Sequence, residues 1–469
     1  MKDQTEYPVE NTQSYLTKSN LSERDAAVVW HPFTQHYTAP FSIPIMRGEG
    51  TYLYDDSGKR YIDAISSWWV NLHGHSHPYI AKKVAEQFLK LEQVIFAGFT
   101  HEPAVRLAER LLEILPKNQA KIFYSDNGST AVEVALKMAI QYFHNQGLTK
   151  KRKVIALENG YHGDTFGTMA VGAKSAFNAP FEGFLYETLY LPTPIKGQET
   201  KTLEAMKTLM KDAEETACFI FEPLIQGAGG MIMYEPKILE ELIILAQENN
   251  VLTIADEIMT GFGRTGKMFA TDYLTIKPDI YCLSKGLTGG AMALGVTSCT
   301  QEIYEAFLSE DRKKTLFHSH SFTANPLACT AGLASLDLLL TEETESKILN
   351  INRLHNEFLN KLLGNVVGVE VVCGDTDNGL VGENTNHGAK HPKITDIRIK
   401  GTILVIELHA PEGTSYFSNI RDVAYQFFIE KGILIRPLGN VIYLLPPYCI
   451  SEEDLKYIYE CIEAFLEKI

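Results

Sequence analysis

Cysteine is scarce in this 469-residue chain, and none of its seven copies forms a Cys-x-x-Cys pair. An odd, unpatterned set of cysteines favours free thiols over a disulfide framework, and free thiols are typical of the reducing cytoplasm. Long apolar runs are absent too. None approaches the roughly 18–20 residues that span a bilayer, and residues 1–25 lack the apolar core of a signal peptide. The sequence therefore predicts a cytoplasmic protein with no membrane partner.

Positive charge is also in short supply. The 43 Lys and Arg residues are outnumbered by 58 Asp and Glu residues, which gives a net charge of −15, and no basic stripe runs along the chain. A nucleic-acid partner is therefore not expected. The remaining composition is that of an ordinary globular protein, with 45% apolar and 22% charged residues. The length suits two domains, or one large domain with a smaller one.

Two positions organise the rest of the sequence, Asp256 and Lys285. Each ends a short apolar run, at residues 250–256 and 279–285, and such runs suit buried parallel strands. Ligands of open α/β sheets lie outside the carboxyl ends of the strands. Alone, either residue is more typical of a turn or a solvated strand end. Together they match what a protein contributes to pyridoxal phosphate chemistry. The lysine supplies a partly buried amine, and the aspartate pairs with the pyridine nitrogen.

A candidate anion site begins where the expected strand 121–124 runs into a cluster of turn and cap residues at 125–130. Apolar residues then recur at helical spacing from Ala131 to Tyr142. The free N–H groups and the positive end of such a helix can bind phosphate. The same pattern is also that of a plain helix N-cap, and both interpretations stay open.

Further strands are expected to end in polar residues. The strand at 153–157 leads into the loop 159–165, and the strand at 217–221 is followed by Glu222. Strands that alternate with helical stretches predict an α/β fold with a mainly parallel sheet.

The domain organisation follows from the pattern of strands and helices. Up to about residue 331 the two alternate, and after it come long helical runs and less regular strands. We expect an N-terminal arm with part of the small domain at 1–65, a large domain at 66–330, and a smaller C-terminal α+β domain at 331–469. A hairpin is predicted at Tyr52–Asp63, and the polar stretch 373–393 is expected to be a surface loop.

Three patterns suggest other chemistry. Residues 261–266 match Gly-x-Gly-x-x-Gly, but they do not open a helix directly after a strand, as a dinucleotide site requires. The neighbours Asp256 and Glu257 would point to opposite faces of a strand, so they are not expected to form a glycosidase pair. The alternate histidines of segment 73–77 have no matching Cys or acid nearby, and we expect no metal site.

Two segments carry candidate substrate contacts. Trp68 and Trp69 are two of the three tryptophans, and on an extended chain they would face opposite ways, so that one lines a pocket while the other packs. Arg436 lies in the apolar stretch 433–437, where an unpaired buried charge would be costly. Its partner is either a substrate carboxylate or an internal Asp or Glu, and both remain open.

The segments 256–266, 283–286 and 289–290 resemble those of the class III (ω-type) aminotransferases, which are fold-type I pyridoxal phosphate enzymes. Further segments narrow the resemblance to one branch of that family, at 30–35, 66–69, 159–167, 226–230, 325–329 and 435–437. The resemblance implies a large domain built on a mainly parallel seven-stranded sheet, a smaller α+β domain, bound pyridoxal 5′-phosphate, and a homodimer with a shared active site.

The resemblance also implies a role for each site residue. Lys285 would bind the cofactor and then move a proton between substrate and cofactor, Asp256 would keep the pyridine nitrogen protonated, and Tyr161 would stack on the ring. The other expected cofactor contacts are Gly128 and Ser129 at the phosphate, Asp164 and Glu222 as supports of the site, and Ser321 from the second subunit. The expected substrate contacts are Phe33, Trp68, Ser319, Arg436 and Tyr443.

The branch implies 8-amino-7-oxononanoate as the amino acceptor, S-adenosylmethionine or lysine as the donor, and a ping-pong reaction. Phe33 stands where users of S-adenosylmethionine typically have tyrosine, whereas Trp68 favours that donor, which we prefer. Ser319 replaces a usual glycine and could crowd a backbone contact to the substrate. The alternatives are another class III ω-aminotransferase and a non-catalytic module that senses the cofactor or binds DNA.

Overall fold

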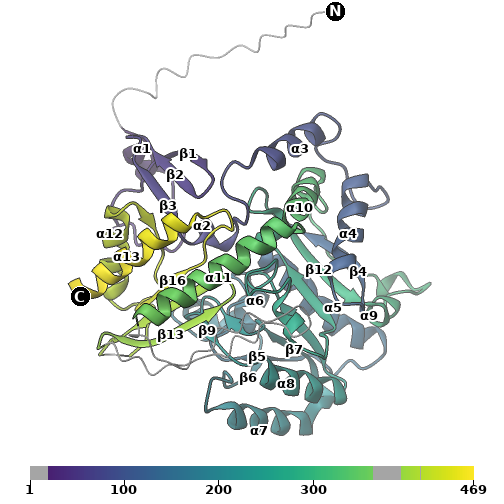
Figure 1. Ribbon diagram of the computed structural model, residues 1–469. Coiled ribbons are helices and arrows are strands. Elements are labelled where there is room, and N and C mark those ends of the chain that lie inside the picture. The colour runs from purple at the N-terminus through teal and green to yellow at the C-terminus, as the bar shows by residue number, and fades with distance from the viewer. Residues whose placement is uncertain (1–19, 363–391, 412) are drawn as a thin grey trace, which may run out of the picture.

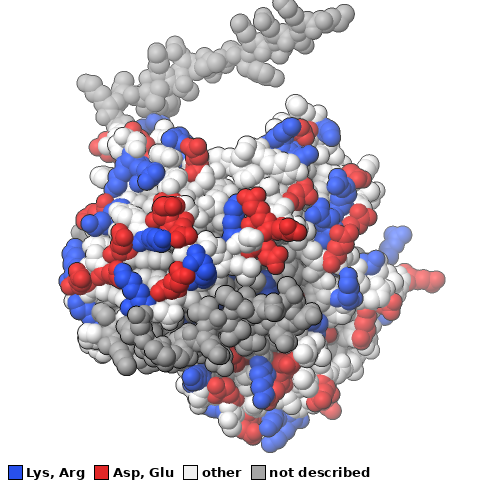
Figure 2. Space-filling view, viewed as in Figure 1, with Lys and Arg blue, Asp and Glu red and all other residues white. Residues whose placement is uncertain are grey.

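The computed structural model describes residues 20–362, 392–411 and 413–469. The expected surface loop at 373–393 lies almost wholly outside these residues, as does the first part of the N-terminal arm. A large layered unit carries a smaller unit built from both ends of the described chain (Figure 1). On the face shown in Figure 2, acidic and basic side chains are interspersed. No helix of the described ranges is long and apolar enough to cross a membrane.

The large unit is built on a seven-stranded sheet of order β4-β12-β11-β10-β7-β5-β6. Its strands are β4 (Gln119–Ser125), β5 (Lys153–Leu157), β6 (Thr188–Leu191), β7 (Thr216–Phe221), β10 (Leu252–Asp256), β11 (Ile280–Leu283) and β12 (Gly295–Thr300). β12 runs antiparallel to both of its neighbours, and the other pairs are parallel. The apolar central strands are buried, as expected where helices cover both faces. The predicted α/β fold is confirmed.

Successive side chains of the central strands enter two different cores. Phe219 of β7 belongs to the core that contains α4 (Glu102–Ile114) and α8 (Pro236–Glu248). Its neighbour Ile220 belongs to the core under α5 (Gly128–Asn145). This is the two-residue repeat of a β-strand, and it places the sheet between helical layers. Because β4 leads directly into α5, the N-terminus of this long helix lies at the carboxyl edge of the sheet.

The smaller unit joins segments that are far apart in the sequence. One sheet contains β1 (Ile45–Glu49), β2 (Tyr52–Asp55), β3 (Arg60–Asp63) and β15 (Ile433–Leu434), and another contains β13 (Ile394–Lys400), β14 (Ile403–Leu408) and β16 (Val441–Leu444). Alongside lie α11 (Glu342–Leu362), α12 (Ile420–Glu430) and α13 (Glu452–Lys468) (Figure 1). The antiparallel β2–β3 pair is the predicted hairpin, and β3 pairs in parallel with β15. The predicted domain limits themselves stay a prediction.

The expected N-terminal arm contains a helix, α1 (Leu21–Val28), which Asn20 caps and which buries none of its residues. One local prediction differs from the structure. The extended chain expected at Trp68 and Trp69 is instead a kinked helical turn, α2 (Ser66–Trp69). The turn still separates the two rings, since Trp69 is buried and Trp68 is 39% exposed.

Shorter elements connect these units. The helices are α3 (Pro78–Phe88), α6 (Phe166–Val171), α7 (Glu199–Leu209), α9 (Gln301–Glu305) and α10 (Pro326–Leu339), and β8 (Ile225–Gln226) pairs with β9 (Ile232–Met233). The 3-10 turns are η2 (Ala179–Phe184), η3 (Met210–Glu215), η4 (Ala270–Tyr273), η5 (Lys285–Thr288) and η6 (Arg312–Lys314). Of these, η5 follows β11 and β8 follows β7, so both begin at the carboxyl edge of the large sheet.

Candidate active site

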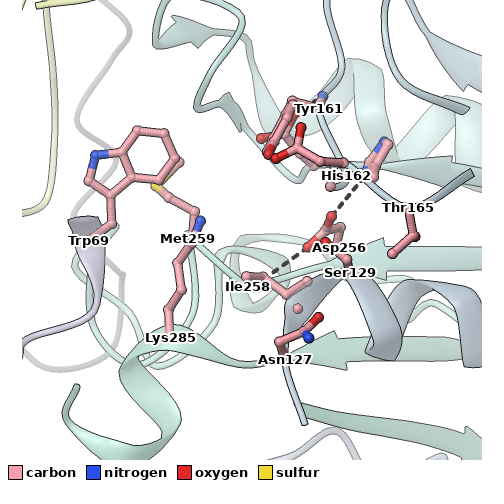
Figure 3. Close-up of a pocket in the computed structure, with 14 residues that line it drawn as sticks. Trp69, Asn127, Ser129, Tyr161, His162, Thr165, Asp256, Ile258, Met259 and Lys285 are labelled. Carbon is pink, nitrogen blue, oxygen red and sulfur yellow. Dashed lines mark hydrogen bonds and ion pairs between the residues drawn. The ribbon is translucent and has the colours of Figure 1, made fainter. Parts of the chain in front are cut away.

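A cavity of about 340 Å³ opens where β5, β7, β10 and β11 end (Figure 3). The carboxyl ends of parallel strands meet at one edge of the sheet, so residues far apart in sequence converge there. The cavity is lined by Trp69, Asn127, Gly128, Ser129, Tyr161, His162, Gly163, Asp164, Thr165, Glu222, Asp256, Ile258, Met259 and Lys285. All the expected cofactor contacts except Ser321 are in this set.

Lys285 follows β11 and begins the turn η5 with a left-handed backbone, φ +44°. Its Nζ atom lies 4.4 Å from the centre of the Trp69 ring. Burial lowers the pKa of the Lys285 amine to about 8, against the opposing charges of Asp256 and Glu222. The positive charge of Arg264 adds to the lowering. The amine therefore releases its proton far more readily than a solvated lysine, as a nucleophile requires.

Asp256, the last residue of β10, is buried and fixed through both carboxylate oxygens. Its Oδ1 accepts the N–H of Ile258 at 3.1 Å, and its Oδ2 lies 2.7 Å from Nδ1 of His162 (Figure 3). Burial works against a charged His162, but the hydrogen bond and the charge of Asp256 outweigh it, so the pKa of His162 is raised. A carboxylate supported in this way can hold a positive charge in the cavity.

The N-terminus of α5 forms an anion cradle. Asn127 and Thr130 cap the helix reciprocally, with the Thr130 N–H donating to Asn127 Oδ1 at 2.9 Å, and the cap leaves the N–H groups of Gly128 and Ser129 at the cavity. Opposite them stands Gly163, where an added Cβ would lie 2.1 Å from Ser129 Oγ. The close approach of the two loops therefore requires a glycine. The arrangement suits a phosphate group and goes beyond a plain N-cap.

Glu222 connects two loops at the cavity, those that contain Tyr161 and Gly227. Its carboxylate is buried and accepts the N–H of Tyr161 at 2.9 Å and of Gly227 at 2.8 Å. Burial raises the pKa of Glu222 to about 7; the positive charge of His162 opposes the shift, and the negative charge of Asp256 adds to it. Burial and the charge of Asp164 likewise raise the pKa of the Tyr161 hydroxyl, which stays protonated. The backbone at Tyr161 is thus held by an acid that directly follows β7.

Three of the expected substrate residues form a second cluster. The Phe33 ring lies 5.6 Å from that of Trp68, and Cζ of Arg436 lies 4.7 Å from the centre of the Trp68 ring. Among the described residues, no Asp or Glu forms an ion pair with Arg436. The described residues therefore supply no internal acid for Arg436, and its role toward a substrate carboxylate stays a prediction.

None of the five expected substrate contacts lines the cavity itself, and neither does Ser321. Tyr443 is buried behind Trp69, whose indole Nε1–H donates to the Tyr443 hydroxyl at 2.9 Å. Ser319 and Ser321 lie on the segment before α10, and the Ser321 carbonyl accepts from the Gln93 side chain at 2.6 Å. The role expected for Ser321 in a second subunit stays a prediction.

The sequence interpretation assigned no specific role to two cavity residues that contact Lys285 or Asp256 directly. Trp69 was expected to pack or to line a pocket, and it does both, since its ring covers Lys285. His162 was overlooked, although its place directly after Tyr161 in an expected strand-end loop was an available signal. Asn127, Thr165, Ile258 and Met259 also line the cavity without an assigned role.

The patterns that suggested other chemistry have structural roles. His73 lies 3.0 Å from the Ser335 hydroxyl and His75 lies 2.9 Å from Asp63, so the two rings have separate partners. No group of three His, Cys, Asp or Glu residues that could hold a metal occurs in the part of the chain that the structure describes. Glu257 points away from Asp256 and accepts from Thr260 and Thr271.

Comparison with known proteins identifies the family. The model of the class III aminotransferases matches residues 33–374 and 376–466. The adenosylmethionine-8-amino-7-oxononanoate aminotransferase of Synechococcus elongatus is 44% identical over 94% of this chain and 99% of its own. The protein of that name from Staphylococcus aureus is 36% identical over 96% of this chain and 98% of its own.

Solved structures agree with this assignment. The crystal structure of adenosylmethionine-8-amino-7-oxononanoate aminotransferase from Methanocaldococcus jannaschii has a TM-score of 0.84 at 36% identity, covering 96% of this chain and 98% of that one. The omega transaminase of Pseudomonas jessenii, solved in complex with PMP, also has a TM-score of 0.84, at 26% identity over 96% of this chain and 98% of that one. Because the family model matches most of its length and a relative is 44% identical over 94% of it, this chain belongs to the class III aminotransferases.

Proposed function

We propose that the chain uses pyridoxal 5′-phosphate to convert 8-amino-7-oxononanoate to 7,8-diaminononanoate, a step of biotin synthesis, with S-adenosylmethionine as amino donor. The observation that carries the proposal is the meeting of Lys285 and Asp256 in one buried cavity. Arg436, which has no carboxylate partner among the described residues, supports an acceptor that bears a carboxylate. The names of the relatives supply the acceptor and the donor.

The residues present fit this cofactor. The N–H groups of Gly128 and Ser129 would hold the phosphate at the start of α5, where Gly163 leaves room for a close approach. Asp256, supported by His162, would hold the proton on the pyridine nitrogen. When bound, pyridoxal phosphate supplies an aldehyde that condenses with amines and a ring that accepts the electron pair freed at the amine carbon.

Three side chains, those of Lys285, Trp69 and Arg436, have separate roles in this reaction. The Lys285 amine would hold the cofactor, and the same amine is placed to move the proton at the reacting carbon. Trp69 covers the Lys285 amine and limits its contact with water. Arg436 would bind the acceptor's carboxylate through its planar fork of N–H donors. The same groups serve both half-reactions, as a ping-pong scheme needs.

The aromatic residues around Phe33 bear on the choice of amino donor. Phe33 lacks the hydroxyl typical of users of S-adenosylmethionine, yet its ring lies 5.7 Å from Phe177 and 5.6 Å from Trp68. This aromatic wall suits a donor with a large apolar or planar part better than it suits lysine. Trp68 favours the same choice.

We also propose a cytoplasmic homodimer in which Ser321 of one subunit reaches the phosphate bound by the other. Two large apolar side chains close to it, Phe317 and Phe322, are 70% and 63% exposed. Exposed aromatic residues so close together are typical of a surface that a second subunit covers.

A half-reaction tests the proposal. The purified protein is loaded with pyridoxal phosphate, and the visible absorbance of the bound cofactor is followed after S-adenosylmethionine or lysine is added separately. We expect conversion by S-adenosylmethionine, followed by return of the original spectrum on addition of 8-amino-7-oxononanoate. Lys285→Ala should abolish both changes.

Other outcomes separate the alternatives. Conversion by lysine alone would replace the donor and leave the acceptor in place. Return of the spectrum with 2-oxoglutarate or pyruvate, but not with 8-amino-7-oxononanoate, would favour another ω-aminotransferase, a class to which the Pseudomonas jessenii structure belongs. Bound cofactor with no response to any amine would favour the non-catalytic alternative.

A further inference from the structure

The turn that carries Trp68 and Trp69 has an unusual backbone. Ser66, Ser67 and Trp69 have φ angles of +53°, +60° and +67°. Residues with a Cβ rarely adopt this left-handed region, because the side chain crowds the following carbonyl oxygen. Three such residues among four consecutive positions persist only where the surroundings hold them.

The side-chain carboxylate of Asp63 holds this turn by accepting hydrogen bonds from it. Its carboxylate is fully buried and accepts the N–H of Ser67 at 2.6 Å and of Ile65 at 3.1 Å. The Ser67 hydroxyl donates to the same carboxylate at 3.3 Å, and Nε2 of His75 lies 2.9 Å from it. A buried carboxylate needs donors of this kind, since an unpaired one would be costly. Both the carboxylate and the turn are therefore fixed by the same contacts.

The turn serves both ends of the active site. The Trp69 ring lies 4.4 Å from Nζ of Lys285 and is anchored through its indole N–H to the Tyr443 hydroxyl. The next ring along the chain, that of Trp68, lies 4.7 Å from Cζ of Arg436. The neighbours Trp69 and Trp68 thus contact the reacting amine and the cation that would bind a carboxylate. The backbone of the turn therefore sets the distance between Lys285 and Arg436.

We propose that Asp63 is a positioning residue for amino transfer. Through the left-handed turn it holds Trp69 against the amine of Lys285 and Trp68 against Arg436, and it thereby fixes the spacing between the amine end and the carboxylate end of the substrate. The substrate in this statement rests on the proposed function, whereas the coupling of Asp63 to the two rings does not.

The chain contains a matched control in Asp55. This carboxylate also organises a turn, since it accepts from the Ser57 N–H at 3.0 Å, the Ser57 hydroxyl at 2.7 Å and the Lys59 N–H at 2.9 Å. Its turn belongs to the β2–β3 hairpin, and none of these residues lines the cavity. The Tyr61 hydroxyl of β3 also donates to Asp55, at 2.9 Å. Asp55→Asn therefore tests the loss of the same kind of contact at a turn whose own residues do not line the cavity.

Fluorescence can report the two rings directly. In a Trp30→Phe background, Trp68 and Trp69 are the only tryptophans, because the chain has three. Acrylamide quenching of the loaded enzyme then measures how accessible the two indoles are, and steady-state kinetics give KM and kcat. For Asp63→Asn we expect about a twofold higher quenching constant and about a tenfold higher KM for 8-amino-7-oxononanoate, with a smaller change in kcat. Asp55→Asn should change neither.

A second variant guards against loss of folding. His75→Leu removes one contact to the Asp63 carboxylate and leaves the residues of the turn unchanged, so it should raise quenching and KM in the same direction by less. Wild-type quenching and wild-type KM in Asp63→Asn, or equal effects in Asp55→Asn, would overturn the inference. A wild-type enzyme that does not use 8-amino-7-oxononanoate, while Asp63→Asn still raises quenching, would overturn the proposed function and leave the positioning role standing.

Discussion

His162 and Asp256 form a buried pair, with Nδ1 of the histidine 2.7 Å from Oδ2 of the aspartate. The histidine comes from the loop after β5 and the aspartate from the end of β10, so two strand ends are joined at the floor of the cavity. Burial opposes a charged His162, but the hydrogen bond and the charge of Asp256 raise its pKa, and the histidine gives Asp256 a hydrogen-bond donor.

The first prediction concerns this pair. His162→Phe keeps a ring of similar size but leaves Asp256 Oδ2 without its donor, which weakens its hold on the cofactor's pyridine nitrogen. We expect the affinity for pyridoxal phosphate and kcat each to fall about ten- to a hundredfold. Absorbance titration of the apoprotein and steady-state rates measure the two effects. His355→Phe is the matched control, since His355 is equally buried and lies 2.7 Å from the Tyr459 hydroxyl, away from the cavity.

The second prediction concerns pH and the amine of Lys285. Burial lowers its pKa to about 8, so the rate at which the apoprotein takes up pyridoxal phosphate should rise with pH and level off above about 8. The negative charge of Glu222 works against the lowering. Glu222→Gln should therefore move the midpoint of this profile to lower pH. Glu215→Gln, which removes a surface partner of Lys153, should leave it unchanged. A midpoint near the ordinary lysine value would contradict the prediction.

The third prediction concerns stability. His355 is buried between the Tyr459 hydroxyl at 2.7 Å and the Thr402 carbonyl at 3.2 Å, and burial lowers its pKa to about 4. An unfolded histidine titrates near 6.5, so between these values the unfolded chain binds the proton and the folded chain does not. The stabilisation is fully present above about pH 6.5 and is lost as the pH falls toward about 4.

Urea unfolding at pH 7 and pH 5 measures this effect. The free energy of unfolding of the wild type should fall between these two pH values by about 2 kcal/mol more than that of His355→Gln. Tyr459→Phe is the control, because it removes a hydrogen-bond partner but keeps the histidine. An equal fall in wild type and His355→Gln would rule out this source of acid sensitivity.

The sequence could predict the parts of the site that depend on local pattern. Asp256, Lys285 and Glu222 follow short apolar strands, and parallel strands bring their carboxyl ends to one edge. The cover of Lys285 by Trp69 could not be predicted in this way. It depends on a left-handed turn that Asp63 holds locally and that Arg264, nearly 200 residues away in sequence, contacts at the Trp69 carbonyl. The conformational propensity of a residue depends on its near neighbours, so it cannot predict a contact between residues so far apart in the sequence.

The last prediction concerns Arg436, whose Cζ atom lies 4.7 Å from the centre of the Trp68 ring and which forms no ion pair with an Asp or Glu among the described residues. Arg436→Gln removes the cation proposed for the acceptor's carboxylate, so KM for 8-amino-7-oxononanoate should rise about ten- to a hundredfold, the range of a charge-assisted hydrogen bond. Arg421→Gln is the matched control. Arg421 also lies over an aromatic ring, 5.3 Å from that of Tyr416, but it pairs with Asp422 at 2.9 Å.

A substrate change makes the test specific for the carboxylate. The methyl ester of 8-amino-7-oxononanoate lacks the negative charge, so the wild type should handle it with the raised KM of Arg436→Gln. Arg436→Gln itself should have the same KM for the acid and the ester, because it lacks the guanidinium that would bind the carboxylate. If Arg436→Gln still prefers the acid by the wild-type factor, another cation binds the carboxylate, and Arg436 serves only to pack against Trp68.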